Sequence, residues 1–339
     1  KIVKRVGDII VDGTKIQAHA SKHSDVSYER AGKLIEQLTL EVEELEQKAE
    51  EADSVPLDDG LTVPKEVKRR EERITRLEEA RKEIEKHYEK DRKQAQQEYE
   101  RKMADREERH RNGKPLGGIP KPPSDEVPGK LQHNFTDPDS HIMKAGSGQH
   151  FEQAYNAQAA VDADGSMIIL GARVTSNSND KKELQPTVES VIENIREPDA
   201  VLADNGYFSE TEISKMEADG GPKAYVATGK TKHGRTVADL EERDDPPAPD
   251  ENATMSEKMN HRLSTREGKE KYKARKQTVE PVFGIIKEAM GFRQFHLRGH
   301  PKVEIEWGLV CLAYNVRRLF RLAAGTAVAE LLKKAPAEA

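Results

Sequence analysis

The sequence predicts an α/β fold: a mixed sheet with flanking helices, interrupted by a long helical insertion. Three observations predict it. Short apolar strand patterns begin near residue 9 and return after residue 150, residues 28–112 are nearly free of glycine, and a Gly/Pro/Lys-rich stretch at 112–129 separates the two kinds of pattern. A chain of 339 residues has room for two or three structural units.

Composition excludes several classes of protein. Charged residues make up 35% of the chain, and the mean hydropathy is −0.86, so part of the length does not build an ordinary core. No apolar run is long enough to cross a membrane, and the basic start lacks the apolar segment of a signal peptide, which predicts a soluble, cytosolic protein. A single cysteine, Cys311, excludes disulfide frameworks and cysteine-based zinc sites. The start at Lys1 indicates a piece whose natural N-terminus is missing.

The stretch 28–112 carries a heptad pattern on both sides of a breaker at Pro56–Gly60. We therefore predict an antiparallel coiled-coil hairpin as the insertion. Its first arm has the stripe Ile35, Leu38, Val42, Leu45 and Ala49, and its second the stripe Val67, Ile74, Leu77, Ile84 and Tyr88. The expected organisation is first strands in 1–27, the insertion in 28–112, a linker in 113–150, the rest of the α/β domain in 151–325 and a tail in 326–339.

The remaining elements are expected in a fixed order. Two strands at 153–161 and 167–174 are joined by the turn Asp162–Gly165, and they follow an earlier strand at Ile9–Val11 that leads through Asp12–Gly13 into another. A helix at 180–195, a strand at Ala200–Ala203 and helices at 209–218, 265–290 and 304–322 complete the pattern. Three antiparallel strands, a helix and a strand beside the first form an RNase H-like arrangement. In the last helix, the stripe of Trp307, Leu309, Val310, Leu312 and Val316 is expected to lie in the core.

Three carboxylates stand where catalysis would want them. Asp12 and Asp204 each follow an apolar strand, and Glu280 lies on a helix that Val279, Val282 and Phe283 would anchor on the core. Carboxylates from two strands and a helix can converge on one or two Mg²⁺ ions, which prefer hard oxygen ligands. Each also has a plainer interpretation, because Asp12–Gly13 and Asp204–Gly206 are good turn sequences and Glu280 before Pro281 suits a helix start.

Other polar residues are given structural roles. Asp162 is assigned to turn chemistry and Asp180 to the capping region of a helix. The eleven histidines lack ligand spacing, so His296 and His300 are assigned to the surface or to phosphate contacts. Between Met255 and Arg321, 15 Lys/Arg face 7 Asp/Glu, a local charge of +8 that favours a phosphate-contacting surface over a merely solvated one. Gly-rich phosphate cradles are absent, which argues against a nucleotide cofactor.

Four motifs together resemble the DDE transposases of bacterial insertion sequences, of the group with an RNase H-like catalytic domain and a Tyr–Arg–Glu–Lys signature. They are DGTK at 12–15, YNAQAAVD at 155–162, LADNGY at 202–207 and YKARKQTVEPVFGIIK at 272–287, which WGLVCLAYN at 307–315 extends. The resemblance covers nearly the whole chain, including the insertion, and implies that an N-terminal domain is lacking.

The resemblance implies the roles of individual residues. Asp12, Asp204 and Glu280 would be the catalytic, metal-binding acids, using Mg²⁺ or Mn²⁺ as a substitute. The DNA-binding residues would be Tyr272, Arg275 and Lys287 of the signature, together with the basic residues Lys276, Arg293 and Arg298. The family pattern has three residues between its Arg and Glu, whereas Arg275 leaves four, so Arg275 and Lys276 are both candidates for that position.

The implied function is metal-dependent cleavage of DNA at the ends of an insertion sequence, followed by strand transfer into target DNA. The implied partners are double-stranded DNA and a second copy of the chain, with no membrane and no nucleotide, in the bacterial cytoplasm at the nucleoid. Three alternatives remain open: a remnant that binds DNA without completing transposition, a coiled-coil interaction scaffold, and a general RNase H-like nuclease without end specificity.

Overall fold

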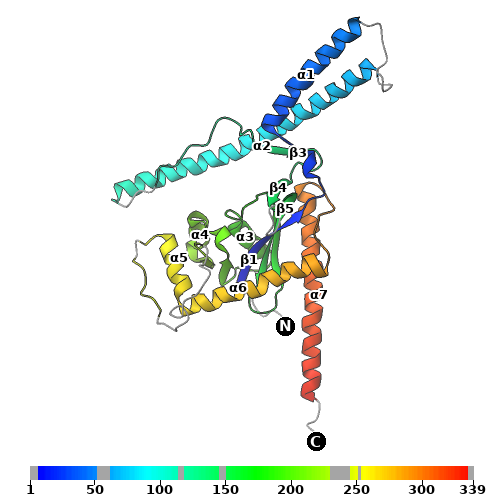
Figure 1. The fold of residues 1–339 in the computed structure, drawn as a ribbon. Helices are drawn as coiled ribbons and strands as arrows, with labels where there is room; N and C mark the ends of the chain where they lie inside the picture. The colour runs from blue at the N-terminus through cyan, green and yellow to red at the C-terminus, as the bar shows by residue number, and fades with distance from the viewer. Residues whose placement is uncertain are drawn as a thin grey trace. The chain divides into compact units, whose positions relative to one another are not determined.

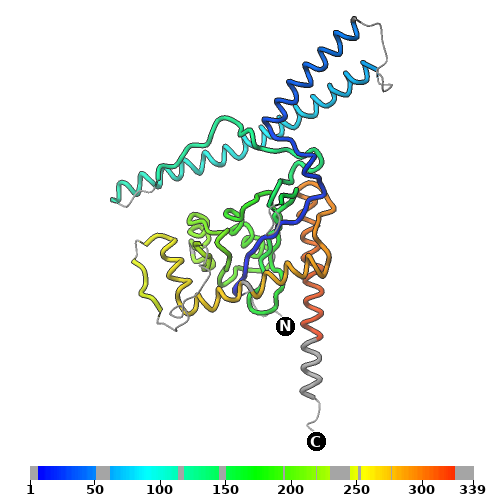
Figure 2. The backbone as a smooth tube through the Cα atoms, viewed as in Figure 1, coloured from blue at the N-terminus to red at the C-terminus, as the bar shows by residue number. Residues whose placement is uncertain are grey.

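The computed structural model forms two compact units, each described separately (Figures 1 and 2). The sheet unit combines Lys1–Ala20 with Asp139–Ala339, and the helical unit is Ser21–Pro138. The structure describes residues 7–51, 62–113, 118–144, 150–229, 245–250 and 253–334. The expected breaker at Pro56–Gly60 lies outside the described residues.

A mixed sheet forms the centre of the sheet unit, in the order β4-β5-β1-β7-β8, with β6 also paired to β5. β1 is antiparallel to β5 and parallel to β7, and β7 is parallel to β8. The strands are β1 (Asp8–Gln17), β4 (His141–Lys144), β5 (Phe151–Asp162), β6 (Ile169–Thr175), β7 (Ala200–Ala203) and β8 (Lys223–Val226). β4 lies inside the segment 113–150 that the sequence analysis treats as a linker.

β1 is one continuous strand, so the prediction of a strand end at Asp12–Gly13 is wrong. Asp12 pairs with Ala159 and Gly13 with Gln158 of β5, in an unbroken register that reaches Gln17. The pairing with β5 extends over residues 9–17 and overrides the local turn preference of an Asp-Gly pair. Asp12 therefore lies in the middle of the central strand.

Helices cover both faces of this sheet. The face with Ile10, Tyr155 and Leu202 packs against the last two long helices, and the face with Ile9, Val11 and Val201 packs against three shorter ones. The first pair is α6 (Arg266–Gly284) and α7 (His300–Lys334), and the others are α3 (Leu184–Asn194), α4 (Glu210–Met216) and α5 (Met255–Ser264). β8 and α5 have no counterpart in the sequence analysis.

The helix expected at 265–290 changes its winding near its end. α6 ends at Gly284 and continues as a π-helical segment, Ile285–Ala289, in which the Met290 N–H donates to the Ile285 carbonyl at 2.9 Å. A π turn holds more residues than an α turn, so positions seven apart across it no longer share a face. Glu280 and Lys287, which would share a face of an uninterrupted α-helix, therefore do not share one here.

The core assignment of the last helix is only partly confirmed. Trp307 is fully buried and its indole N–H donates to the Gln158 carbonyl at 3.0 Å, whereas Leu309, Leu312 and Val316 are exposed. α7 places Trp307, Cys311 and Tyr314 on the sheet, and the other three apolar residues point away from that face. Both faces of α7 are apolar, which is why the sequence pattern misassigned them.

The helical unit contains α1 (Tyr28–Glu51), α2 (Val63–Arg111) and a two-stranded ladder of β2 (Asp25–Ser27) with β3 (Gln132–Asn134). Its core is formed by Val26, Ala31, Leu38, Leu77 and Ala80. The pairs Tyr28–Arg81 and Glu41–Arg70 show that α1 and α2 run antiparallel (Figure 1). α2 is much longer than α1, and Tyr88 beyond the shared core donates to the Ser124 carbonyl at 2.9 Å.

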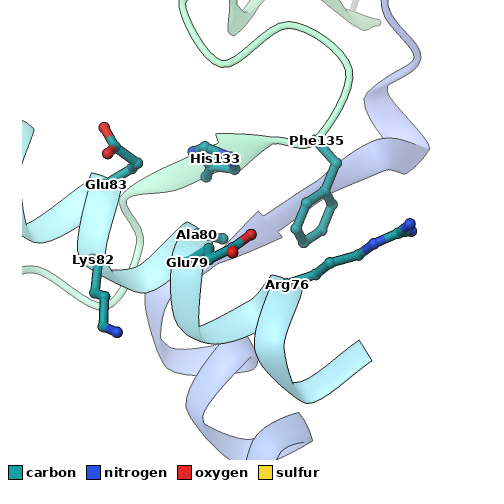
Figure 3. A pocket seen from close by; sticks show the side chains of 7 residues that line it. All are labelled: Arg76, Glu79, Ala80, Lys82, Glu83, His133 and Phe135. Carbon is teal, nitrogen blue, oxygen red and sulfur yellow. The ribbon is translucent and has the colours of Figure 1, made fainter. Parts of the chain in front are cut away.

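A pocket in the helical unit lies between α2 and β3 (Figure 3). Its charges are mixed, with cations and acids alternating along α2. The lining residues are Arg76, Glu79, Ala80, Lys82, Glu83, His133 and Phe135. This balance of charge gives the pocket no preference for an anion or a cation, so we assign it no ligand.

In the described part of the chain, no helix is long and apolar enough to cross a membrane.

Candidate active site

The central pair of parallel strands places two carboxylates at the same level. Ile10 of β1 is in register with Leu202 of β7, and Asp12 and Asp204 each come two residues later. The Asp12 Oδ1 accepts from the Gly13 N–H at 2.8 Å, and the Asp204 Oδ1 accepts from the Gly206 N–H at 2.8 Å. The sheet and these two short bonds hold both acids in defined positions.

Asp12 has the electrostatics of a functional group. Burial raises the pKa of its carboxyl to about 7, and the neighbouring Asp204 carboxylate acts in the same direction. The Gly13 hydrogen bond and the Arg275 guanidinium oppose this rise without cancelling it. A carboxyl that holds its proton near neutral pH beside a second acid is typical of sites that bind metal ions or transfer protons.

α6 brings a cation and an aromatic residue to these acids. The Arg275 Nη1 lies 3.7 Å from the Asp12 Oδ2, and the Arg275 side chain is only 11% exposed. Its guanidinium carbon lies 5.7 Å from the centroid of the Tyr272 ring. Burial raises the pKa of Tyr272, with Asp204 and Asp12 adding to the rise. Of the residues assigned to DNA, Tyr272 and Arg275 thus lie with Asp12 and Asp204.

Glu280 is not brought to this group. It lies five residues after Arg275 on α6 and is exposed to solvent, on a different side of the helix from the buried Val279 and Val282. Among the described residues, no group of three or more acidic, histidine or cysteine side chains is arranged to hold a metal ion. The side chain of Lys276 lies outside what the structure describes.

The remaining cations occupy separate places. The Lys287 Nζ donates to the Lys15 carbonyl of β1 at 3.0 Å, and burial lowers the pKa of this lysine. Arg293 is exposed and paired with Glu288. The Arg298 Nε donates to the His19 carbonyl at 3.0 Å. Lys287 thus contacts the strand that carries Asp12, whereas Arg293 and Arg298 lie at the surface.

Sequence reasoning missed Asp180. This residue is not a helix cap, because α3 begins at Leu184 with Glu183 at its N-cap. Its Oδ1 accepts from the Asn156 Nδ2 at 2.7 Å and from the Gln158 Nε2 at 2.9 Å. The Lys15 Nζ lies 3.8 Å from the same oxygen, and Asp180 also contributes to the raised pKa of Asp12.

Tyr207 connects this network to Asp204. Its hydroxyl, directly after the Asp204–Gly206 turn, donates to the Gln158 Oε1. Burial raises the pKa of Tyr207, and surrounding carboxylates add to the rise, in the order Asp180, Asp12, Asp204 and Glu183. The phenol therefore stays protonated and keeps donating across the ordinary pH range.

One sequence signal could have revealed this network. Asn156 and Gln158 are amides at alternate positions of a strand whose other residues are mostly apolar, so both point to one face and need buried partners. The turn role of Asp162 is confirmed, since its Oδ2 accepts from the Ser166 N–H at 3.1 Å. The imidazole of His300 contacts the Val174 carbonyl at 2.9 Å.

Changing Gly13 to alanine is expected to disturb the network. An added Cβ would lie 2.3 Å from the Gln158 Nε2, 2.9 Å from the Asn156 Oδ1 and 3.0 Å from the Asp180 Oδ1. Because the two amides are buried and both are bonded to the Asp180 carboxylate, these side chains cannot move aside freely, and we expect a loss of about 1–3 kcal/mol in the free energy of unfolding. Urea titration followed by circular dichroism measures it.

Gly284→Ala is the matched control. Gly284 lies in α6 with open space around its Cα, and alanine favours a helix there by about 0.5–1 kcal/mol. Equal unfolding midpoints for the two variants would contradict the crowding around Gly13.

Comparison with known proteins identifies the family of this chain. Residues 125–316 match the model of the transposase DDE domain family, and the chain belongs to that family. The match includes Asp180, Asp204 and Glu280, while Asp12 precedes it. Searches among curated proteins and solved structures found no match. Transposases act on DNA.

Proposed function

We propose that the chain cleaves DNA at the ends of an insertion sequence and transfers the freed strand to target DNA, with a divalent metal ion, Mg²⁺ or in its place Mn²⁺. The observation that carries the proposal is the pair of Asp12 in β1 and Asp204 directly after the parallel strand β7, with Arg275 of α6 beside Asp12. The family match supports the same reaction class.

The sheet topology supports an RNase H-like fold. Numbered in chain order without β4, the strands lie in the order three, two, one, four, five, with the first three antiparallel and the last two parallel to the first. The helical unit follows β1 and precedes β5, as the proposed coiled-coil insertion requires, and the antiparallel packing of α1 and α2 supports that assignment.

Asp12 and Asp204 fit a divalent cation. Their oxygens are hard ligands, both are fixed by backbone N–H groups, and their mutual repulsion would be relieved by a cation between them. When bound, the metal would lower the pKa of an attacking water or 3′-hydroxyl and stabilise the leaving oxygen. The chain's own residues hold the acids in place and exclude bulk water from the buried side of Asp12.

We assign the third acid to Glu280, with Asp180 as the competing candidate. Glu280 lies on the helix that already contacts Asp12 through Arg275, but it is exposed. Asp180 is close enough to raise the pKa of Asp12, but two amides and Lys15 already contact its Oδ1. Mutation of each acid in turn distinguishes them.

The buried cation beside the acids supports phosphate binding. The Arg275 Nε is buried and finds no hydrogen-bond partner among the described residues, so this guanidinium has a donor left for a phosphate that enters the site beside Asp12. Tyr272, Lys276 and Lys287 on the same helical stretch, together with Arg293 and Arg298, are proposed to extend the contact along the backbone. Two element ends joined in one event would require two copies of the chain.

The experiment is a nicking assay on plasmid DNA that carries the element's own ends, with Mg²⁺ or Mn²⁺. We expect metal-dependent nicks with 3′-hydroxyl ends, and a loss of at least about 10³-fold for Asp204→Asn, because electrostatic stabilisation of phosphoryl transfer depends on the metal-binding acids. The same loss for Glu280→Gln but not Asp180→Asn would support Glu280 as the third acid.

Glu288→Gln is the matched control, since this acid is exposed, lies eight residues after Glu280 and pairs with Arg293. It should nick at the unmutated rate. Equal nicking by Asp204→Asn and the unmutated chain would overturn the proposal. Nicking of DNA without the element's ends at the same rate would instead indicate a general nuclease.

A second candidate is a remnant that binds DNA without cleaving it. The absence of a three-acid group among the described residues favours this reading. It predicts DNA binding that Arg275→Gln weakens, with no nicking by any form of the chain in either metal.

A further inference from the structure

The outward face of α7 carries six large apolar side chains that are between 37% and 75% exposed. They are Ile305, Leu309, Leu312, Val316, Leu319 and Phe320, and we call them the α7 stripe. The opposite face of the helix packs Trp307 and Tyr314 into the core. A surface helix usually has one polar face, so a helix that is apolar on both faces indicates a partner.

The spacing of the stripe defines the kind of partner. Ile305, Leu309, Leu312, Val316 and Leu319 follow one another at intervals of four, three, four and three residues. This is the heptad seam that packs against another helix with the same seam. Beside the seam, Gly308, Ala313 and Asn315 are uncharged, and the acid Glu306 is occupied by the backbone N–H groups of His296 and Leu297. These positions leave room for a second helix and do not attract a DNA phosphate.

We propose that the α7 stripe is a dimerisation surface whose occupant is the α7 stripe of a second copy of this chain. A self-complementary patch around a twofold axis needs no other protein. Pairing two stripes would bury twelve large apolar side chains that are exposed in the single chain, an apolar centre of the kind that homodimer interfaces have.

The surface is distinct from the predicted helical hairpin. Among the described residues of α1 and α2, Leu40 of α1 is the only large apolar side chain that is exposed. A single side chain does not form a seam. The self-association therefore belongs to α7, and it does not depend on the proposed cleavage activity.

Sedimentation equilibrium of the full chain tests the proposal. We expect a discrete species of twice 38.0 kDa at micromolar concentration. The double variant Leu309→Lys/Leu312→Lys should be monomeric. We expect its dimer dissociation constant to be at least about 100-fold higher, because four charges would enter the seam. At concentrations low enough for the unmutated chain to be monomeric, the two proteins should have the same unfolding midpoint, since both residues are exposed in the single chain.

Leu40→Lys is the matched control, because Leu40 and Leu309 are each 61% exposed. It should remain a dimer. Phe320→Lys gives a second variant at the most exposed position of the stripe, and it should also weaken the dimer. A monomer for the unmutated chain, a broad distribution of aggregates, or a dimer that survives in the double variant would each overturn the proposal.

Discussion

Replacing Asp12 by asparagine is expected to abolish DNA nicking and to stabilise the folded protein. The carboxylate is lost from the proposed metal site, so nicking should fall by at least about 10³-fold. At pH 8 the wild-type acid is ionised although it is buried beside Asp204, which costs stability. Asparagine removes that charge and can still accept from the Gly13 N–H, so we expect the free energy of unfolding to rise by about 1–3 kcal/mol.

Asp8→Asn is the control from the same strand and the same face. The Asp8 Oδ2 lies 2.7 Å from the Lys271 Nζ, so losing this pair should lower stability slightly and leave nicking intact. Opposite signs of the stability change at positions 8 and 12 distinguish a strained functional acid from a structural one. Unchanged nicking by Asp12→Asn would remove this residue from the mechanism, and lower stability would contradict the cost of its charge.

Stability in the presence of a chelator is expected to fall as the pH rises from about 4 to about 7. The pKa of Asp12 is raised from 3.8 to about 7 in the folded chain, so in this window the folded state holds a proton that the unfolded state has released. The stabilisation from this proton is complete below the pKa of Asp12 in the unfolded state. It disappears as the pH rises through the pKa of Asp12 in the folded state. About three pKa units correspond to at most about 4 kcal/mol.

Other groups titrate in this range, so the measured quantity is the difference between the unmutated chain and Asp12→Asn across the pH series. Mg²⁺ should stabilise the unmutated chain at pH 8 and hardly at pH 5, because the cation competes with the proton on Asp12. Sodium at matched ionic strength is the control. Identical pH slopes for the two proteins would show that Asp12 titrates normally.

Several parts of the site followed from local sequence patterns. Asp204 after a short buried strand, and the buried residues Val279, Val282 and Phe283 of α6, needed only hydrophobic periodicity and turn chemistry. The path of β1 through Asp12–Gly13 did not, because a long-range ladder with β5 decides it. Local propensity cannot anticipate a partner more than a hundred residues away.

The two main failures have the same physical origin. Asp180 was assigned to a helix cap because its sequence neighbours suggest one, whereas amides from β5 determine its position. Leu309 and Leu312 were assigned to the core because an apolar stripe on a helix usually faces the sheet. In each case the residue type suggested a role, but the direction in which the side chain points depends on elements that are distant in the sequence.

The β2–β3 ladder of the helical unit has a consequence for how the chain folds. β1 cannot pair during synthesis until β5 has been made, and the long loop between Gln17 and Ala154 is slow to close. Once Asp25 pairs with Asn134, only residues 18–24 and 135–153 still have to be spanned between Gln17 and Ala154. The effective loop is then shortened by about two halvings, which lowers the entropic cost of closure by roughly 1.2 kcal/mol. A helical unit that folds early would thus bring β1 close to its partner strand and favour their pairing.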